Sequence, residues 1–277
     1  MNTLSLARPA AGRPTTAALR RRLRDLPAEL WARERRLALF GALLLALLLP
    51  MAVAAGLDER VLRGVNVWIK PMKFALSIAV LALTTAWFVG HLRPERRATR
   101  SVDAIVWLLI GSGSFELGYI TLQAALGQGS HYNVGDPLHA TMYTLMGLGA
   151  LVLTATQPML AWQLLRHGDR ARPAAVRLAV LLGLALTFVF GAGVGLLLGG
   201  LQPPSGPGLP LLGWSLAGGD LRPAHFIGVH AEQALPLVGF AAAALGLRRS
   251  KTIVWGATLA YTALFVALVA WGLAGRA

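Results

Sequence analysis

Residues 212–236 read LGWSLAGGDLRPAHFIGVHAEQALP, a glycine-rich polar loop followed directly by an apolar helical segment. The loop ends in Asp220 and Arg222, and the helical segment begins at Pro223. Polar and ionisable groups inside a membrane helix are costly, and they usually mark a site. This stretch therefore predicts a membrane helix that carries part of a polar site. The polar residues of the segment are His225, His230, Glu232 and Gln233.

The rest of the chain repeats apolar segments of the length that spans a bilayer. Of its 277 residues 56% are hydrophobic, and the mean hydropathy is +0.60, which is too apolar for an ordinary soluble domain. We predict an all-α, polytopic membrane helix bundle with seven transmembrane helices. The expected spans are 37–57, 68–90, 102–125, 137–164, 175–199, 223–246 and 253–274.

The basic residues predict how the bundle is oriented. The formal net charge is +14, but the arginines gather in the first 36 residues and after the second, fourth and sixth segments. By the positive-inside rule the N-terminus is cytoplasmic and the C-terminus extracytoplasmic. This pattern explains the charge without nucleic acid. Residues 1–36 form a basic cytoplasmic arm, either solvated or partly an interfacial amphipathic helix, and residues 37–277 form the membrane domain.

Three inward-running segments begin alike, with a proline followed two places later by an ionisable residue. Proline suits the first helical position, because its missing N–H has no helical partner there. The three helix N-termini, with their positive dipole ends, are therefore expected at similar depth. The beginnings are Lys70-Pro71-Met72-Lys73, Asp136-Pro137-Leu138-His139 and Arg222-Pro223-Ala224-His225.

Glu116, in the third segment, supplies a negative charge below the same surface. The rise of the helix places it deeper than Lys73 by a distance that a lysine side chain can nearly bridge. We therefore expect a Lys73–Glu116 pair, which serves either a functional site or only helix packing. Gln123 lies seven residues after Glu116 and shares its helix face.

Four of the six histidines are expected on the outer side, and they leave three readings open. Imidazole and carboxylate donors suit a transition metal, and two histidines from different helices suit haem b. The same groups suit a polar ligand or ion site, or structural hydrogen bonding. Cysteine is absent, which excludes thiolate ligands and disulfides. The candidate ligands are His131, His139, His225 and His230.

Two outward connections complete the candidate pocket. Residues 126–136 carry His131 with Asn133 and Asp136, and residues 200–222 are long and rich in glycine and proline. A loop of that length is either a lid or slack surface. The expected polar pocket is formed by Lys70, Lys73, Glu116, Gln123, Asn133, Asp136, Asp220, Arg222 and Gln233.

Three stretches, WIKPMKF at 68–74, SHYN at 130–133 and residues 206–236, resemble an uncharacterised family of bacterial multi-pass membrane proteins. The resemblance implies a bacterial inner-membrane setting and no particular activity. Glu232 departs from it, since an apolar residue is expected there, which makes Glu232 a weaker site candidate than Glu116.

The leading hypothesis is a membrane protein that binds a transition metal or haem b, with redox or lipid-hydrolase chemistry. The alternative is a transporter or sensor of a small polar ligand or proton. The third is a structural or assembly protein in the bilayer without a ligand.

Overall fold

The computed structural model describes residues 16–205, 208–210, 212–215 and 217–274, and it is helical almost throughout. The helices are α1 (Thr16–Arg33), α2 (Arg35–Leu57), α3 (Ile69–Val89), α4 (Pro94–Arg97), α5 (Arg100–Ala125), α6 (Pro137–His167), α7 (Ala174–Gly200), α8 (Arg222–Val229), α9 (Ala231–Ala244) and α10 (Ser250–Ala274). A hairpin of two short strands, β1 (Val61–Leu62) and β2 (Val65–Asn66), joins α2 to α3.

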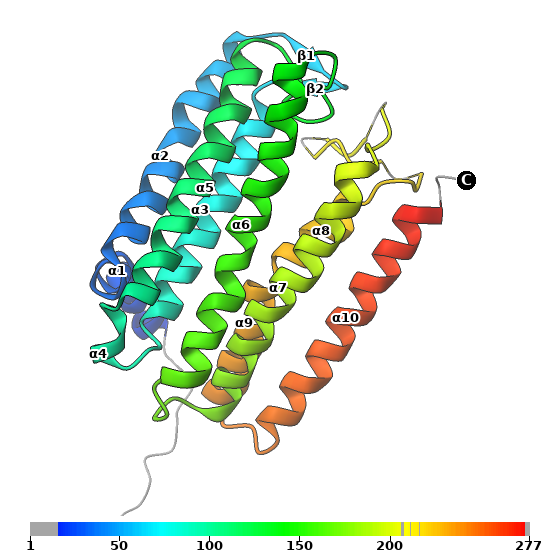
Figure 1. The fold of residues 1–277 in the computed structure, drawn as a ribbon. Coiled ribbons are helices and arrows are strands. Elements are labelled where there is room, and N and C mark those ends of the chain that lie inside the picture. Colours follow the sequence, from blue (N-terminus) through cyan, green and yellow to red (C-terminus); the bar gives the residue numbers. More distant parts are fainter. Residues whose placement is uncertain (1–15, 206–207, 211, 216, 275–277) are drawn as a thin grey trace, which may run out of the picture.

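Among these, 6 helices are long and apolar enough to cross a membrane, or up to 7 if the bent pair α8–α9 counts as one span. The single helices match six of the expected spans to within a few residues. The fold is therefore that of a multi-pass helical membrane protein, as the apolar runs predict. The elongated bundle is drawn in Figure 1.

The expected uninterrupted helix over 223–246 is wrong. It is broken at His230 into α8 and α9, which meet at 48°. At the break the N–H of Glu232 donates to Thr187 Oγ1 of α7 at 2.9 Å, so a side chain of the neighbouring helix takes a donor that an unbroken helix would direct to its own backbone. The break brings His230, Glu232 and Gln233 together at a bend in the apolar interior.

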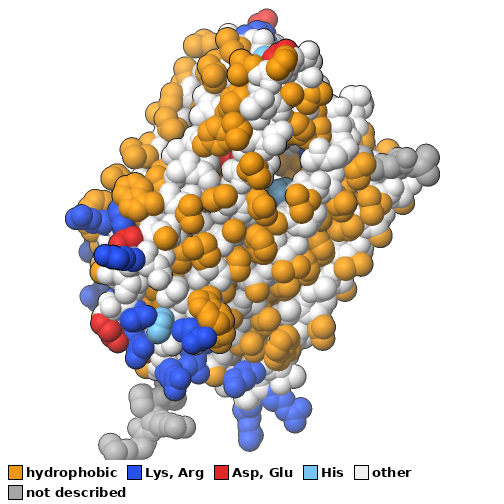
Figure 2. Space-filling model, viewed as in Figure 1, with side chains coloured by type: hydrophobic (Ala, Val, Ile, Leu, Met, Phe, Trp, Pro, Cys, Tyr) orange, Lys and Arg blue, Asp and Glu red, His pale blue; other side chains and the backbone are white. Residues whose placement is uncertain are grey.

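The helix ends divide the molecule into two chemically different ends (Figure 1). We call the end with β1–β2, the loops 126–136 and 201–221, and the beginnings of α3, α6 and α8 the hairpin end. The opposite end, with α1, α4 and the connections 90–99, 168–173 and 245–249, is the arginine-rich end. Lys and Arg side chains gather at its surface in Figure 2, whereas hydrophobic side chains cover the flank between the ends.

The three proline-containing helix beginnings lie at the hairpin end, as expected, but their registers differ. Pro137 is the first residue of α6, and Asp136 caps that helix by accepting hydrogen bonds from Leu138 N and His139 N at 3.0 and 3.1 Å. Pro71 is instead the third residue of α3, so the expected first position is wrong there. It is tolerated because the first-turn N–H groups have no helical acceptor.

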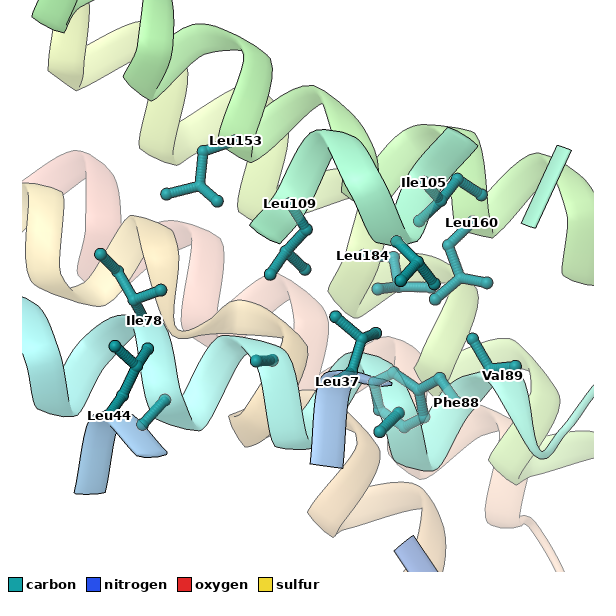
Figure 3. Close-up of a cluster of buried hydrophobic side chains, with 14 of the residues drawn as sticks. Leu37, Leu44, Ile78, Phe88, Val89, Ile105, Leu109, Leu153, Leu160 and Leu184 are labelled. Carbon is teal, nitrogen blue, oxygen red and sulfur yellow. The ribbon is translucent and has the colours of Figure 1, made fainter. Parts of the chain in front are cut away.

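The largest part of the core is an apolar cluster between α2, α3, α5, α6 and α7. Figure 3 shows Leu37 beside Phe88 and Val89, and Ile105 beside Leu160 and Leu184. In lipid such packing stabilises helix association mainly by van der Waals contact.

Between α7 and the pair α8–α9, glycine residues instead allow the backbones to approach closely. A Cβ on Gly228 of α8 would meet the backbone of Phe190 on α7 at 2.9 Å, and one on Gly183 would meet Glu232 Cα at 3.0 Å. This close approach holds the broken helix against the middle of α7. Gly191 contributes to the same close packing, because a Cβ there would meet Val229 Cγ1 at 2.9 Å.

Candidate functional site

Lys70 and His131 form the centre of the polar site at the hairpin end. Lys70 lies in the first turn of α3, and its Nζ is 3.1 Å from Nδ1 of His131 in the loop before α6. Burial, reinforced by the Lys70 charge, lowers the pKa of His131 to about 3. The imidazole is therefore neutral at neutral pH, and in its Nε2–H tautomer its Nδ1 can accept a hydrogen bond from Lys70 Nζ. The rings of Phe74 and Tyr143 lie around it, at 6.1 and 5.8 Å between centroids.

The loop before α8 lies over the beginning of α3. Lys73 Nζ donates to the Leu212 carbonyl at 3.0 Å, and Arg222 Nη2 donates to the Gly213 carbonyl at 2.6 Å. Arg63 in the β-turn also donates to the Pro203 carbonyl. These tethers favour the reading of residues 200–222 as a cover, at least for the part of the loop that the structure describes.

Asp220 fixes the base of this cover. Its side chain is 0% exposed and accepts from Ser215 N at 2.9 Å, as well as pairing with Arg222 at 2.6 Å. Burial alone would raise the pKa of Asp220, but the hydrogen bonds from Arg222 and Ser215 outweigh it and hold the pKa below its usual value. Asp220 and Arg222 therefore act as a structural pair, and among the described residues neither Lys70 nor Lys73 forms an ion pair with a carboxylate.

The expected Lys73–Glu116 pair is wrong, because Lys73 turns towards Leu212 instead. Glu116 is 2% exposed and lies against α6, where a Cβ on Gly149 would be 2.7 Å from its Oε1. That oxygen has no hydrogen-bond partner. Lys70, rather than Lys73, is the lysine whose charge Glu116 experiences, yet no ion pair joins them in the described chain. Gln123, 4% exposed, lies further along α5, and its Oε1 is also unpartnered.

A second buried carboxyl group lies at the bend between α8 and α9. Glu232 is 0% exposed, and its backbone N–H donates to Thr187 Oγ1 of α7 at 2.9 Å. Gln233 donates to Glu232 Oε1 at 2.8 Å and to Thr84 Oγ1 of α3 at 3.1 Å, and its own Oε1 lies 3.1 Å from His230 Nδ1. Glu232 Oε2 has no partner. The bend therefore places a carboxyl group with one unsatisfied oxygen deep among the helices.

Two further candidates lie near the surface of the hairpin end. His139 bonds its own cap residue Asp136 through Nδ1, and its Nε2 lies 3.1 Å from Gln128 Oε1. Asn133 is half-buried in the same loop. His225 instead packs against α7, where its ring is 3.5 Å from a Cβ placed on Gly195, and its buried Nδ1 has no hydrogen-bond partner. The predicted site residues thus lie at several separate places: the beginning of α3 with the loop over it, the cap of α6, the interior of α5, and the broken helix α8–α9.

The residues do not fit the expected metal centre. No group of three or more His, Asp or Glu side chains in the described chain could hold a metal ion. His139 is also a poor axial ligand for haem b, because Asp136 and Gln128 already engage both of its ring nitrogens. The histidines fit the structural hydrogen-bonding reading better. His230 with Gln233, and His131 with Lys70, are examples.

Several partners of the site could not be singled out from the sequence. Thr84 and Thr187 look like ordinary helix residues, and the Leu212 acceptor is a backbone carbonyl.

Fold and site together define a multi-pass membrane protein with ionisable side chains buried among its helices. No family model, curated protein or solved structure matches the chain.

Proposed function

We propose that the protein is a membrane transporter of a small polar solute that carries both an anionic group and a hydrogen-bond donor, as an amino acid does. The observation that carries the proposal is that Lys70 and Glu116 lie in the hairpin-end halves of α3 and α5 without forming an ion pair. A cation and a carboxyl group held apart in an apolar bundle suit a solute that satisfies both.

The anionic group of the solute is assigned to the beginning of α3. There Lys70, the nearby Lys73 and the positive end of the helix dipole all favour negative charge. Neutral His131 positions the Lys70 ammonium without neutralising it. The solute's donor group is assigned to the free Oε1 of Glu116.

Two further features suit a transporter better than a cofactor protein. The tethered 201–221 loop can cover a bound solute, and its contact to Lys73 is a single hydrogen bond through the Leu212 carbonyl that can be exchanged. Broken helices that carry polar groups near mid-membrane are a recurrent way to build transport sites. We place the protein in the bacterial cytoplasmic membrane, with the arginine-rich end in the cytoplasm.

Thermal unfolding of the detergent-purified protein tests the site, because a ligand that binds only the folded state raises the melting temperature. The panel consists of amino acids, with small monocarboxylates and small amines as half-ligands. We expect stabilisation by at least one amino acid and by neither half-ligand at the same concentration. Lys70→Gln and Glu116→Gln should each weaken binding about 10- to 100-fold, the usual worth of a charged hydrogen bond.

Uptake into proteoliposomes then separates a transporter from a sensor, which would bind the same solute without accumulating it. Glu59→Gln is the matched control, since this carboxyl group is exposed at the same end. If no panel member binds, or if both site variants bind like the wild type, the proposal fails. A Soret band or a stoichiometric metal in the purified protein would restore the cofactor hypothesis.

A further inference from the structure

A separate cavity opens at the arginine-rich end, on the far side of the bundle from Lys70. Its volume is about 460 Å³, and it lies where the ends of α3 and α6 meet the beginnings of α7 and α10. Cationic side chains outnumber acidic ones in its lining, with Asp169 as the single carboxylate. The cationic side chains are Arg170, Arg172, Arg177 and Lys251.

Two buried nitrogen atoms line this cavity without a hydrogen-bond partner. They are Nε2 of His91, which is 3% exposed, and Nε of Arg172, whose nearest carboxylate, Asp169, lies 4.0 Å away, beyond hydrogen-bond distance. Burial, together with the charges of Arg172, Arg33 and Arg97, lowers the pKa of His91 to about 3. The imidazole is therefore neutral, and in its Nε2–H tautomer it offers a donor without adding charge. Unsatisfied buried donors beside several cations favour an anionic acceptor with more than one oxygen.

The other wall of the cavity is apolar and faces outward. Leu165 is 62% exposed and Trp255 is 50% exposed, and both line the cavity together with Leu178 and Leu181. Arg177 and Lys251 lie in the first turns of α7 and α10, next to this apolar wall. The cavity thus joins a polar inner part to the apolar flank that would face acyl chains. This combination suits an amphiphile better than a free ion.

We infer that this cavity binds the phosphate of an anionic phospholipid, with the acyl chains lying along Leu165 and Trp255. Basic pockets between membrane helices are known to hold such headgroups. Arg172 and His91 would hydrogen-bond the phosphate oxygens, and Arg177 and Lys251 would supply further charge. The inference does not depend on the transported solute, because the two sites lie at opposite ends.

The test uses the full-length protein in nanodiscs made from equal parts of phosphatidylglycerol and phosphatidylcholine, followed by mass spectrometry of the lipids retained on the protein. We expect wild type to retain phosphatidylglycerol preferentially. The double variant Arg177→Gln/Lys251→Gln should reduce that preference roughly 20-fold, since each cation near an anionic lipid contributes about fivefold. Neither side chain makes an ion pair in the described structure, so the fold should survive.

Arg248→Gln/Arg249→Gln is the matched control, because it removes the same charge from exposed positions at the same end, outside the cavity lining. Equal loss in this control, or no lipid preference in wild type, would overturn the inference. A second arm titrates inorganic phosphate against the lipid-loaded protein. Displacement of the lipid by phosphate alone at comparable concentration would identify a free-anion pocket and overturn the lipid assignment.

Discussion

The two ends of α3 place cations at opposite poles of one helix dipole. At the arginine-rich end, Arg97 and Arg172 donate to the Gly90 carbonyl at 3.0 and 3.1 Å, and Arg33 donates to Trp87 O at 2.8 Å. At the hairpin end, Lys70 and Lys73 lie in the first turn. Cations are favoured at a helix C-terminus and disfavoured at an N-terminus.

The difference separates structural charge from charge that serves a ligand. The arginines bond carbonyls that the helix leaves unpaired, so their positions are explained by capping alone. The lysines gain one backbone carbonyl and one imidazole between them, and they oppose the dipole. A cation that does not stabilise its own helix is the better candidate for binding an anion.

The largest effect is expected from Arg33→Met at the capping end. The variant loses the bond to Trp87 O, the stacking of the guanidinium 3.9 Å over the Trp87 ring, and the 2.5 Å pair with Glu29. We expect the free energy of unfolding to fall by about 2 to 3 kcal/mol, measured by thermal or denaturant unfolding in detergent. Arg248→Gln, which is exposed, should change it by less than about 0.5 kcal/mol. Equal stabilities for the two variants would refute the capping role.

Acidification is expected to destabilise both ends, and its effect grows as the pH falls. His131 and His91 both have folded-state pKa values near 3, against 6.5 for an ordinary histidine, because of burial and neighbouring cations. The unfolded state therefore binds more protons between these values, so stability is lost as the pH falls from 6.5 towards 3. Melting temperatures of wild type, His131→Gln and His91→Gln across this range measure the contribution of each end. A slope that neither substitution reduces would contradict the assignment.

The smallest effect is expected from Lys73→Met at the hairpin end. The variant loses one hydrogen bond to the Leu212 carbonyl but also removes a cation from the helix N-terminus. These two terms nearly cancel, so we expect stability to change by no more than about 0.5 kcal/mol. Solute binding should weaken even though the fold is unaffected. A destabilisation as large as that of Arg33→Met would erase the distinction between the two ends.

The sequence predicted the elements whose signal is local. Apolar runs such as 37–57 and 175–199 located α2 and α7 to within two residues, because a span must satisfy its backbone internally whatever surrounds it. The beginning of α6 was also predicted, since Pro137 is its first residue and the preference of proline for that position is local. The prediction of a Lys73–Glu116 pair was wrong because helical rise gives the depth of a residue but not the neighbour that its side chain faces.

By itself, then, the sequence determined a bundle of membrane helices with arginines at one end and lysine- and histidine-bearing helix beginnings at the other. Periodicity, hydropathy and charge are properties of the local sequence, and they can be read without knowing which other segment a helix packs against. Tertiary structure alone decided that Lys70 meets His131, that Lys73 meets a loop carbonyl, and that Glu232 is fully buried beside Thr187. Those contacts depend on how each helix is rotated and how closely it approaches its neighbours. Gly183 and Gly228 allow α7 and the broken helix to approach closely, but that approach exists only in the packed bundle.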